Sequence, residues 1–207
     1  MEKKNKIMAT KESSFLNMVI TLLVITALSG ITLAYINQLT LEPKELSKRA
    51  KKMDALSEVL PTFDNSPLED MYKLAIGNTQ DSLEFFPAYF QDELVGIAVT
   101  SFSTAGYSGD VRLMIGFFPD GTIHKISVLE QKETPGLGTK MTEPKFLHQF
   151  YGKNPESYTL NVKKNGGDVD GITAATISSV AFCDAVHLAY NVFINNPDAV
   201  TGATEKK

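Results

Sequence analysis

The residues best placed to do chemistry in this chain are four hydroxyls that follow a glycine-rich acidic loop. The stretch GGDVDGITAATISS (166–179) places Thr173, Thr176, Ser178 and Ser179 where a helical pattern begins. The first turn of a helix has unpaired N–H groups, which favour hydroxyl caps and bind anions, phosphate in particular. Four hydroxyls in seven residues exceed what capping requires. Plain N-capping nevertheless remains the simpler interpretation of the spacing.

Patterns for other kinds of catalysis are missing from the sequence. The three histidines, His124, His148 and His187, have no partner at metal-ligand spacing, and the single cysteine, Cys183, cannot form a zinc site or an internal disulfide. Neither a dinucleotide-binding glycine motif nor a phosphate-binding loop occurs, and no nucleophile–base arrangement is visible. We therefore assign no catalytic residue and no metal ligand.

A long apolar segment near the N-terminus predicts a membrane anchor. No charged residue occurs between Glu12 and Glu42, and Phe15–Tyr35 is almost continuously apolar. A helix of this length spans roughly 31 Å, which matches a hydrocarbon core about 30 Å thick. A buried soluble helix and a signal peptide cleaved near Ala27-Leu28-Ser29 are the alternatives. We favour an uncleaved anchor, because the apolar run continues beyond a typical signal-peptide core.

The charge distribution bears on orientation and on partners. Lysines flank the apolar segment on both sides, so local charge does not fix its direction, and long domains translocate largely regardless of charge. We expect the short basic N-terminal tail in the cytoplasm and the domain on the periplasmic side of the inner membrane. Residues 36–207 carry 16 basic and 22 acidic side chains, which gives a net charge near −6. This balance argues against nucleic acid as a partner.

The remaining patterns predict an α+β domain with a mixed, mainly antiparallel sheet behind a single transmembrane helix. The strand-like ranges are 94–102, 111–118, 123–131 and 157–162. The helix-like ranges are 42–60, 143–153 and 178–195. The expected organisation is a cytoplasmic tail (1–14), an anchor (15–36), a helical linker (37–82), the α+β domain (83–196) and a flexible tail (197–207).

The hydroxyl-rich stretch also resembles a known modification site. The residues D-G-I-T-A-A-T-I-S resemble the flavinylation motif D-x-x-[ST]-G-A-T-x-[ST] of the FMN-binding domain family. The resemblance implies that Thr176 carries FMN through a phosphoester bond. The matching motif residues that surround it are Asp170, Thr173, Ala175 and Ser178. One position departs from the family pattern, since Ala174 stands where glycine is usual.

A second signature, E-T-P-G-L-G, spans Glu133–Gly138. In the FMN-binding domain family such a loop lies against the flavin, so the resemblance places Glu133, Thr134, Gly136, Leu137 and Gly138 beside the cofactor. The residue types agree, because proline fixes φ and glycines let backbone N–H groups approach a flat ring or its phosphate. A rigid turn is the simpler alternative.

The order of these signatures, together with GYSGDVRLMIGF (106–117), resembles the G subunits of Rnf electron-transport complexes. The C subunit of the sodium-pumping NADH:quinone reductase shares the signatures and is one alternative. The resemblance implies an electron-transfer subunit, rather than an enzyme on its own, in a complex that couples ferredoxin–NAD redox chemistry to ion translocation. It also implies further membrane subunits and a separate flavin transferase as partners. An anchored module that binds a phosphorylated ligand or a partner without redox chemistry is an alternative from another class.

The C-terminal DAVTGATEKK contains a second match to part of the motif. It has the glycine at Gly202, yet Thr204 is followed by Glu205-Lys206 and lacks the second hydroxyl. No helix can follow it within the sequence. We therefore expect Thr176, and not Thr204, to be the attachment site.

Overall fold

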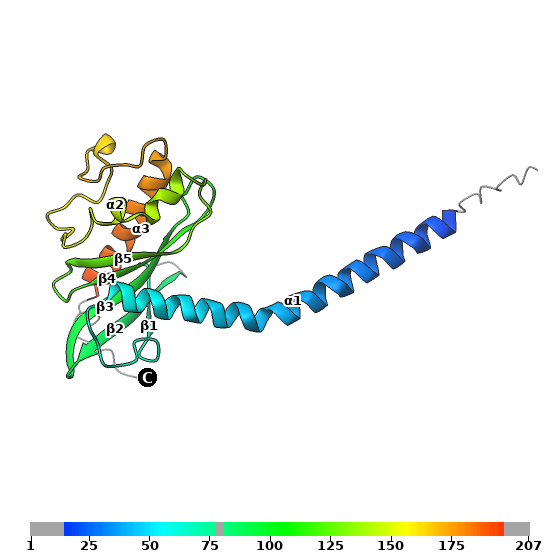
Figure 1. The fold of residues 1–207 in the computed structure, drawn as a ribbon, viewed down its shortest axis with the longest axis horizontal. Coiled ribbons are helices and arrows are strands. Elements are labelled where there is room, and N and C mark those ends of the chain that lie inside the picture. The colour runs from blue at the N-terminus through cyan, green and yellow to red at the C-terminus, as the bar shows by residue number, and fades with distance from the viewer. Residues whose placement is uncertain (1–14, 78–80, 197–207) are drawn as a thin grey trace, which may run out of the picture. The chain divides into compact units, whose positions relative to one another are not determined.

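A computed structural model of the chain describes residues 15–77 and 81–196 (Figure 1). The expected tails, 1–14 and 197–207, lie outside the described residues, and Thr204 lies there with them. The chain divides into two units, Met1–Arg49 and Ala50–Lys207.

The described part of the first unit is the N-terminal portion of helix α1, whose full bounds are Phe15–Val59. Its large apolar side chains between Phe15 and Leu41 are exposed, and this helix is long and apolar enough to cross a membrane. The hydroxyls of Thr21, Thr26 and Thr32 donate to carbonyls one turn earlier, which satisfies them without water. The predicted anchor and the predicted helix 42–60 are therefore parts of one helix.

The second unit is built on a five-stranded antiparallel sheet with the order β1-β2-β3-β4-β5 (Figure 1). The strands are β1 (Tyr72–Ala75), β2 (Ser82–Phe90), β3 (Glu93–Ser103), β4 (Val111–Phe117) and β5 (Ile123–Glu130). Each strand pairs with the one that follows it in the sequence, so the sheet is a meander. The three strands predicted in the middle of the chain are confirmed as β3, β4 and β5.

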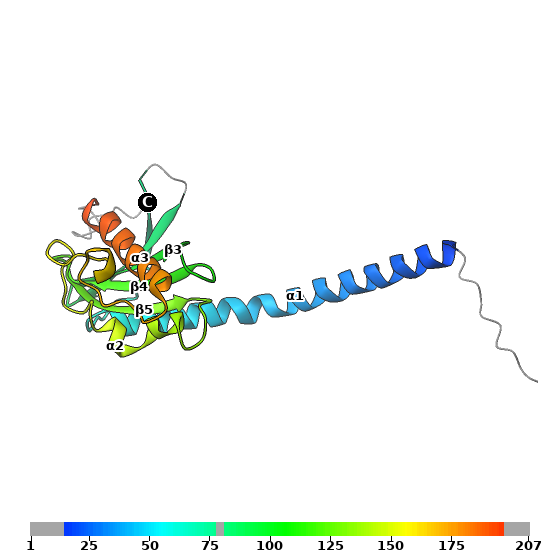
Figure 2. The same ribbon diagram turned by 90° about the horizontal axis from the view of Figure 1, so that it is seen from above.

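Helix α3 (Thr176–Ile194) covers one face of the sheet, as Figures 1 and 2 show. The predicted helical face is confirmed, because Phe182, Val186, Ala189 and Phe193 are all fully buried. The Ser101 hydroxyl on β3 donates to the carbonyl of Ala185 at 2.7 Å. This buried bond holds the middle of α3 against the sheet. Helix α3 is also long and apolar enough to cross a membrane, but most of it is buried inside the domain.

The last turns of α1 and Leu60 cover the opposite face of the sheet. Leu56, Val59 and Leu60 pack against Phe86 and Met114, among other residues. A Cβ at Gly116 would lie 2.0 Å from the Val59 carbonyl oxygen, so close contact at this point requires glycine. The His124 ring nitrogen Nδ1 lies 2.7 Å from the same oxygen. This part of α1 is therefore an integral layer of the domain.

The segment between β5 and α3 contains three short helical turns, η1 (Gly138–Thr142), α2 (Pro144–Leu147) and η2 (Lys163–Asn165). Helix α2 is shorter than the predicted helix 143–153. The helix does not continue to residue 153, because the backbone there pairs with the start of β5. The Gly152 N–H donates to the Ile123 carbonyl, and the Ile123 N–H donates to the Lys153 carbonyl.

The predicted strand 157–162 was wrong. Its backbone is held in turns instead: Tyr158 N–H donates to the Asn154 carbonyl, and Thr159 N–H donates to the Asp168 carboxylate. An isolated bridge joins Val162 to Val169. A backbone carbonyl and a side-chain carboxylate nearby in the sequence thus compete successfully with sheet pairing.

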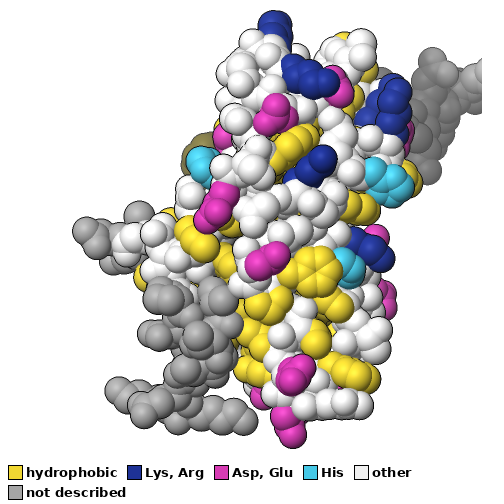
Figure 3. Space-filling view, turned by 90° about the vertical axis from the view of Figure 1, so that its left-hand side faces the viewer, with side chains coloured by type: hydrophobic (Ala, Val, Ile, Leu, Met, Phe, Trp, Pro, Cys, Tyr) yellow, Lys and Arg dark blue, Asp and Glu magenta, His cyan; other side chains and the backbone are white. Residues whose placement is uncertain are grey.

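One face of the domain is shown in Figure 3. On this face Lys and Arg side chains (dark blue) are interspersed with Asp and Glu (magenta), and hydrophobic side chains gather in the lower half. The basic side chains there do not form one continuous surface.

Candidate functional site

A cleft of about 530 Å³ opens at the N-terminus of α3. Three segments far apart in the sequence line it: Tyr107 from the loop between β3 and β4, residues 133–138 from the loop after β5, and residues 174–178. The predicted site residues that it brings together are Glu133, Thr134, Leu137, Gly138, Ala175, Thr176 and Ser178. Parts of both sequence signatures therefore line one cleft.

A buried carboxylate joins the three walls. Glu133 is 4% exposed, and its Oε2 accepts a hydrogen bond from the Ser178 hydroxyl at 2.7 Å. Its Oε1 accepts a bond from the Ser108 backbone N–H at 3.2 Å. The loop after β5, the start of α3 and the loop before β4 are thus held by one side chain.

The glycines of the second signature have packing and turn roles that the sequence did not predict. A Cβ at Gly138 would lie 2.6 Å from the Ser178 hydroxyl oxygen and equally close to the Glu133 Cβ, so this glycine permits packing against α3. Gly136 has φ +76° and is outside the cleft lining. Its N–H donates to the Thr139 hydroxyl at 2.9 Å. The structure therefore uses both glycines to shape the loop.

The four hydroxyls at the start of α3 divide into two pairs. Ser178 donates to Glu133, while Ser179 donates to the Ala175 carbonyl and accepts from the Ile172 N–H. Within the part of the chain that the structure describes, the Thr173 and Thr176 hydroxyls have no hydrogen-bond partner. Thr176 is half-buried and lines the cleft, whereas Thr173 is exposed and lines a neighbouring pocket.

Helix capping does not explain these hydroxyls. The N-cap position is Ala175, and no side chain caps the helix. The simpler interpretation of the sequence was therefore wrong. Among the described residues, the backbone N–H groups of Thr176, Ile177 and Ser178 have no acceptor. The cleft wall thus combines an unpartnered hydroxyl with unpaired N–H groups, which is an arrangement suited to a phosphate.

The apolar part of the cleft comes from side chains that are unusually exposed for their type. Tyr107 is 69% exposed, Ile177 52% and Leu137 39%. Of these, the sequence had identified Leu137 as a site residue. Tyr107 and Ile177 were missed, although an aromatic residue inside the glycine-rich GYSGD loop is a usable signal. Exposed apolar side chains around a hollow favour a ligand with an apolar surface.

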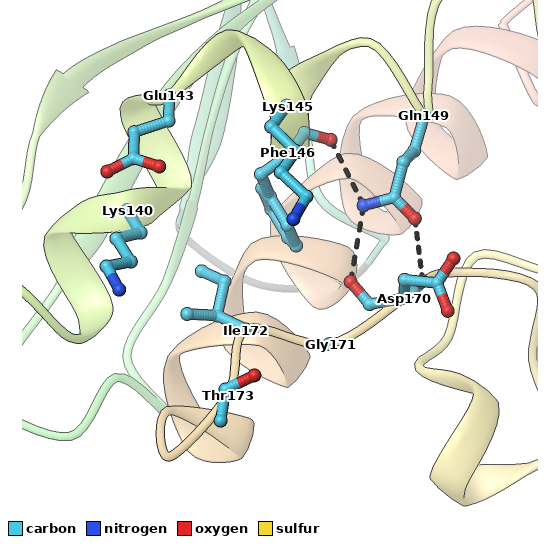
Figure 4. A pocket seen from close by; sticks show the side chains of 9 residues that line it. All are labelled: Lys140, Glu143, Lys145, Phe146, Gln149, Asp170, Gly171, Ile172 and Thr173. Carbon is cyan, nitrogen blue, oxygen red and sulfur yellow. Dashed lines mark hydrogen bonds between the residues drawn. The ribbon is translucent and has the colours of Figure 1, made fainter.

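Asp170 and Thr173 belong to an adjacent pocket of about 420 Å³ (Figure 4). The Gln149 side chain receives a bond from the Asp170 N–H at 2.7 Å and donates to the Asp170 carbonyl at 3.2 Å. The Asp170 carboxylate pairs with Lys163 at 2.8 Å. These bonds fix the loop that leads into α3, so Asp170 supports the cleft from outside its lining.

The departure from the family motif at Ala174 has a structural consequence. Ala174 has φ +61°, which lies in the left-handed region that favours glycine. Its side chain is exposed, so no neighbour crowds the methyl group. The residue stores backbone strain of about 1–2 kcal/mol.

Ala174→Gly is therefore expected to stabilise the domain by roughly 0.5–1 kcal/mol, since relief of strain exceeds the added flexibility of the unfolded chain. Thermal unfolding of the full chain in detergent measures this change. Ala105→Gly, at an exposed position without a positive φ, is the control and should not stabilise. Equal destabilisation of both variants would show that Ala174 is unstrained.

Comparison with known proteins adds independent information. Residues 106–191 match the family model described as an FMN-binding domain, and this range contains all three cleft walls. The G subunit of the Na(+)-translocating ferredoxin:NAD(+) oxidoreductase complex of Acetobacterium woodii is 31% identical over 94% of this chain and 99% of its own length. The G subunit of the ion-translocating oxidoreductase complex of Erwinia tasmaniensis is 32% identical, over 81% of this chain and 84% of its own. The crystal structure of Shewanella oneidensis NqrC has a TM-score of 0.47 and 18% identity, with 70% of each chain covered.

Proposed function

The chain belongs to the family of G subunits of ion-translocating oxidoreductase complexes, and on this premise we propose that it carries FMN and transfers electrons within such a complex. The complex couples redox chemistry between ferredoxin and NAD to ion movement across the membrane. The chain acts together with the other membrane subunits and is not an enzyme on its own. Its charge balance gives no reason to add nucleic acid as a partner.

One observation carries the proposal: the residues that match the FMN-binding domain family include all those that line the cleft, and Thr176 is one of them. The residues present fit FMN. The cleft volume lies within the range of about 300–1,000 Å³ that is usual for cofactor sites. Tyr107, Leu137 and Ile177 offer apolar surface to the flat ring, and the N–H groups at the start of α3 suit the phosphate.

We infer that Thr176 holds the cofactor covalently. Its Oγ forms a phosphoester bond to the flavin phosphate, while the pyrophosphate bond of an FAD donor breaks and AMP leaves. Without a base hydrogen-bonded to it, a threonine hydroxyl is a poor nucleophile at neutral pH. The proton must therefore be removed by a group of the flavin transferase. Once bound, the flavin supplies one- or two-electron transfer, and the chain supplies position and electrostatic environment.

The test is to co-express the full chain with a flavin transferase and to denature it before measurement. The denatured chain is expected to remain fluorescent in a gel, and the peptide that contains Thr176 is expected to carry the mass of FMN. The same chain expressed without the transferase is the control and should be dark. A dark chain in both cases would contradict the covalent proposal and favour a module that binds a phosphorylated ligand.

We further propose that α1 stays attached as the membrane anchor and that the domain faces the periplasm. The short basic tail is easier to retain in the cytoplasm than a large domain is to orient by local charge. Tethering the flavin then has a clear use, because free flavin is not replenished outside the cytoplasm.

A cysteine introduced at exposed Lys125 tests the orientation. A membrane-impermeant maleimide is expected to label Lys125→Cys in intact spheroplasts. The native Cys183 serves as the internal control, because it is buried and burial raises its pKa to about 12, which keeps the thiol protonated and unreactive. Labelling only after lysis would place the domain in the cytoplasm.

A further inference from the structure

The Glu133 carboxylate differs from other carboxylates near the cleft. Glu130 and Asp170, which are exposed, each have a Lys or Arg partner within 4.0 Å. Glu133 is almost fully buried, and no Lys, Arg or His of the described residues lies within that distance of it. It also lines the cleft directly. A carboxylate in this position is shielded from water and has no ion-pair partner among the described residues.

The hydrogen bonds around Glu133 fit an ionised acid. Each oxygen accepts one bond, Oε2 from the Ser178 hydroxyl and Oε1 from the Ser108 N–H. A backbone N–H can only donate, and a carboxylate accepts both bonds without needing a proton. Two neutral donors stabilise the charge but do not cancel it. In a poorly hydrated site such a charge acts over a longer range than at the surface.

We propose that Glu133 is a fixed negative charge that lowers the midpoint potential of the flavin held in this cleft. The inference rests on the proposed function and extends it from binding to redox tuning. Each electron added to a flavin without a proton adds negative charge, which a neighbouring carboxylate disfavours. At about 10 Å and an effective dielectric constant of about 20, the interaction of two unit charges changes an equilibrium constant on the order of tenfold. The same carboxylate thus holds the three walls together by hydrogen bonds and lowers the midpoint potential of the cofactor.

Glu133→Gln separates these two roles. The glutamine Oε1 can accept from the Ser108 N–H while its Nε2 donates to the Ser178 hydroxyl. Both hydrogen bonds are therefore kept and the charge is removed. Glu130→Gln is the matched control, because Glu130 is exposed at the end of β5 and is screened by solvent and by Arg112.

The experiment is a spectroelectrochemical titration of the flavin-loaded full chain in detergent. Glu133→Gln is expected to raise the midpoint potential by about 30 mV, which corresponds to a tenfold change for a two-electron couple. Glu130→Gln is expected to leave it unchanged. A potential in Glu133→Gln that equals that of the wild type would overturn the inference. A wild-type chain that carries no flavin would instead overturn the proposed function, so the two failures are distinguishable.

Ser178→Ala provides a second variant if Glu133→Gln fails to fold or to load. It keeps the carboxylate and removes one of its two donors, so the charge is less stabilised and the potential is expected to fall below that of the wild type. A rise in Ser178→Ala that persists at alkaline pH, where the carboxyl is ionised, would indicate that distortion of the cleft, and not the charge, sets the potential.

Discussion

Thr176→Ala is expected to abolish the flavin fluorescence of the denatured chain while the domain stays folded. The hydroxyl has no hydrogen-bond partner in the described part of the chain, and Ala175, not Thr176, occupies the N-cap position. Its removal therefore breaks no structural bond, and alanine is a better helix former than threonine. The free energy of unfolding should change by no more than about 0.5 kcal/mol. Fluorescence in denaturing gels and thermal unfolding in detergent measure the two effects.

Thr173→Ala and Thr204→Ala are the controls for this result. Thr173 also has an unpartnered hydroxyl among the described residues, but it lines the neighbouring pocket, so its variant should remain fluorescent. Thr204 lies outside the described residues, and its variant should also remain fluorescent. A dark Thr204→Ala chain beside a fluorescent Thr176→Ala chain would move the attachment site to the C-terminal sequence. Fluorescence in all three would refute the assignment of any one of these threonines as the sole attachment site.

Gly116→Ala is expected to destabilise the domain by about 3 kcal/mol, the largest stability change among these variants. The added Cβ would lie 2.0 Å from the carbonyl oxygen and 2.8 Å from the carbonyl carbon of Val59. Both are backbone atoms at the end of α1, so no side-chain rotation relieves the overlap. Overpacking of this kind usually costs about 1–3 kcal/mol, and backbone displacement places this case at the upper end. Thermal unfolding of the full chain measures the loss.

Gly171→Ala is the matched control for Gly116→Ala. A Cβ there would meet its nearest neighbour at 3.6 Å, which is ordinary contact, and Gly171 has no positive φ. Its variant should change stability by less than about 1 kcal/mol. Equal losses in the two variants would mean that the last turns of α1 are not a tightly packed layer of the domain.

The parts of the fold that the sequence predicted correctly are those with local signals. Strands β3, β4 and β5 are long, rich in β-branched residues and separated by clear turns, and α3 repeats its apolar residues along its whole length. Strand β1 has four residues, which is too few for an alternating pattern to be recognised. The segment 157–162 has strand-forming residues, but Asn154 and Asp168 hold its backbone in turns. Acceptors that lie outside a segment cannot be read from its own pattern.

The candidate site also combines features that have a local sequence signal with features that depend on distant contacts. Parts of both signatures line one cleft, whereas Asp170, Thr173 and Gly136 lie outside its lining. The roles of individual residues within them depended on contacts over long separations. The Ser178 hydroxyl bonds to a residue 45 positions earlier, and Ser108 bonds to one 25 positions later. Neither contact has a sequence signal, so the packing of Gly138 and the hydrogen bonds of Glu133 became apparent only from the structure.

The meander order of the sheet also determines when the cleft exists. Strands β1 to β5 pair with successive neighbours, so the sheet can grow as each strand follows the last. The third wall, residues 174–178, begins the helix that follows every strand in the sequence. The cleft that Thr176 lines is therefore complete only after α3 has docked. If the proposed flavin transferase requires the assembled cleft, attachment of the flavin would act as a checkpoint in biogenesis, which marks chains that have completed folding.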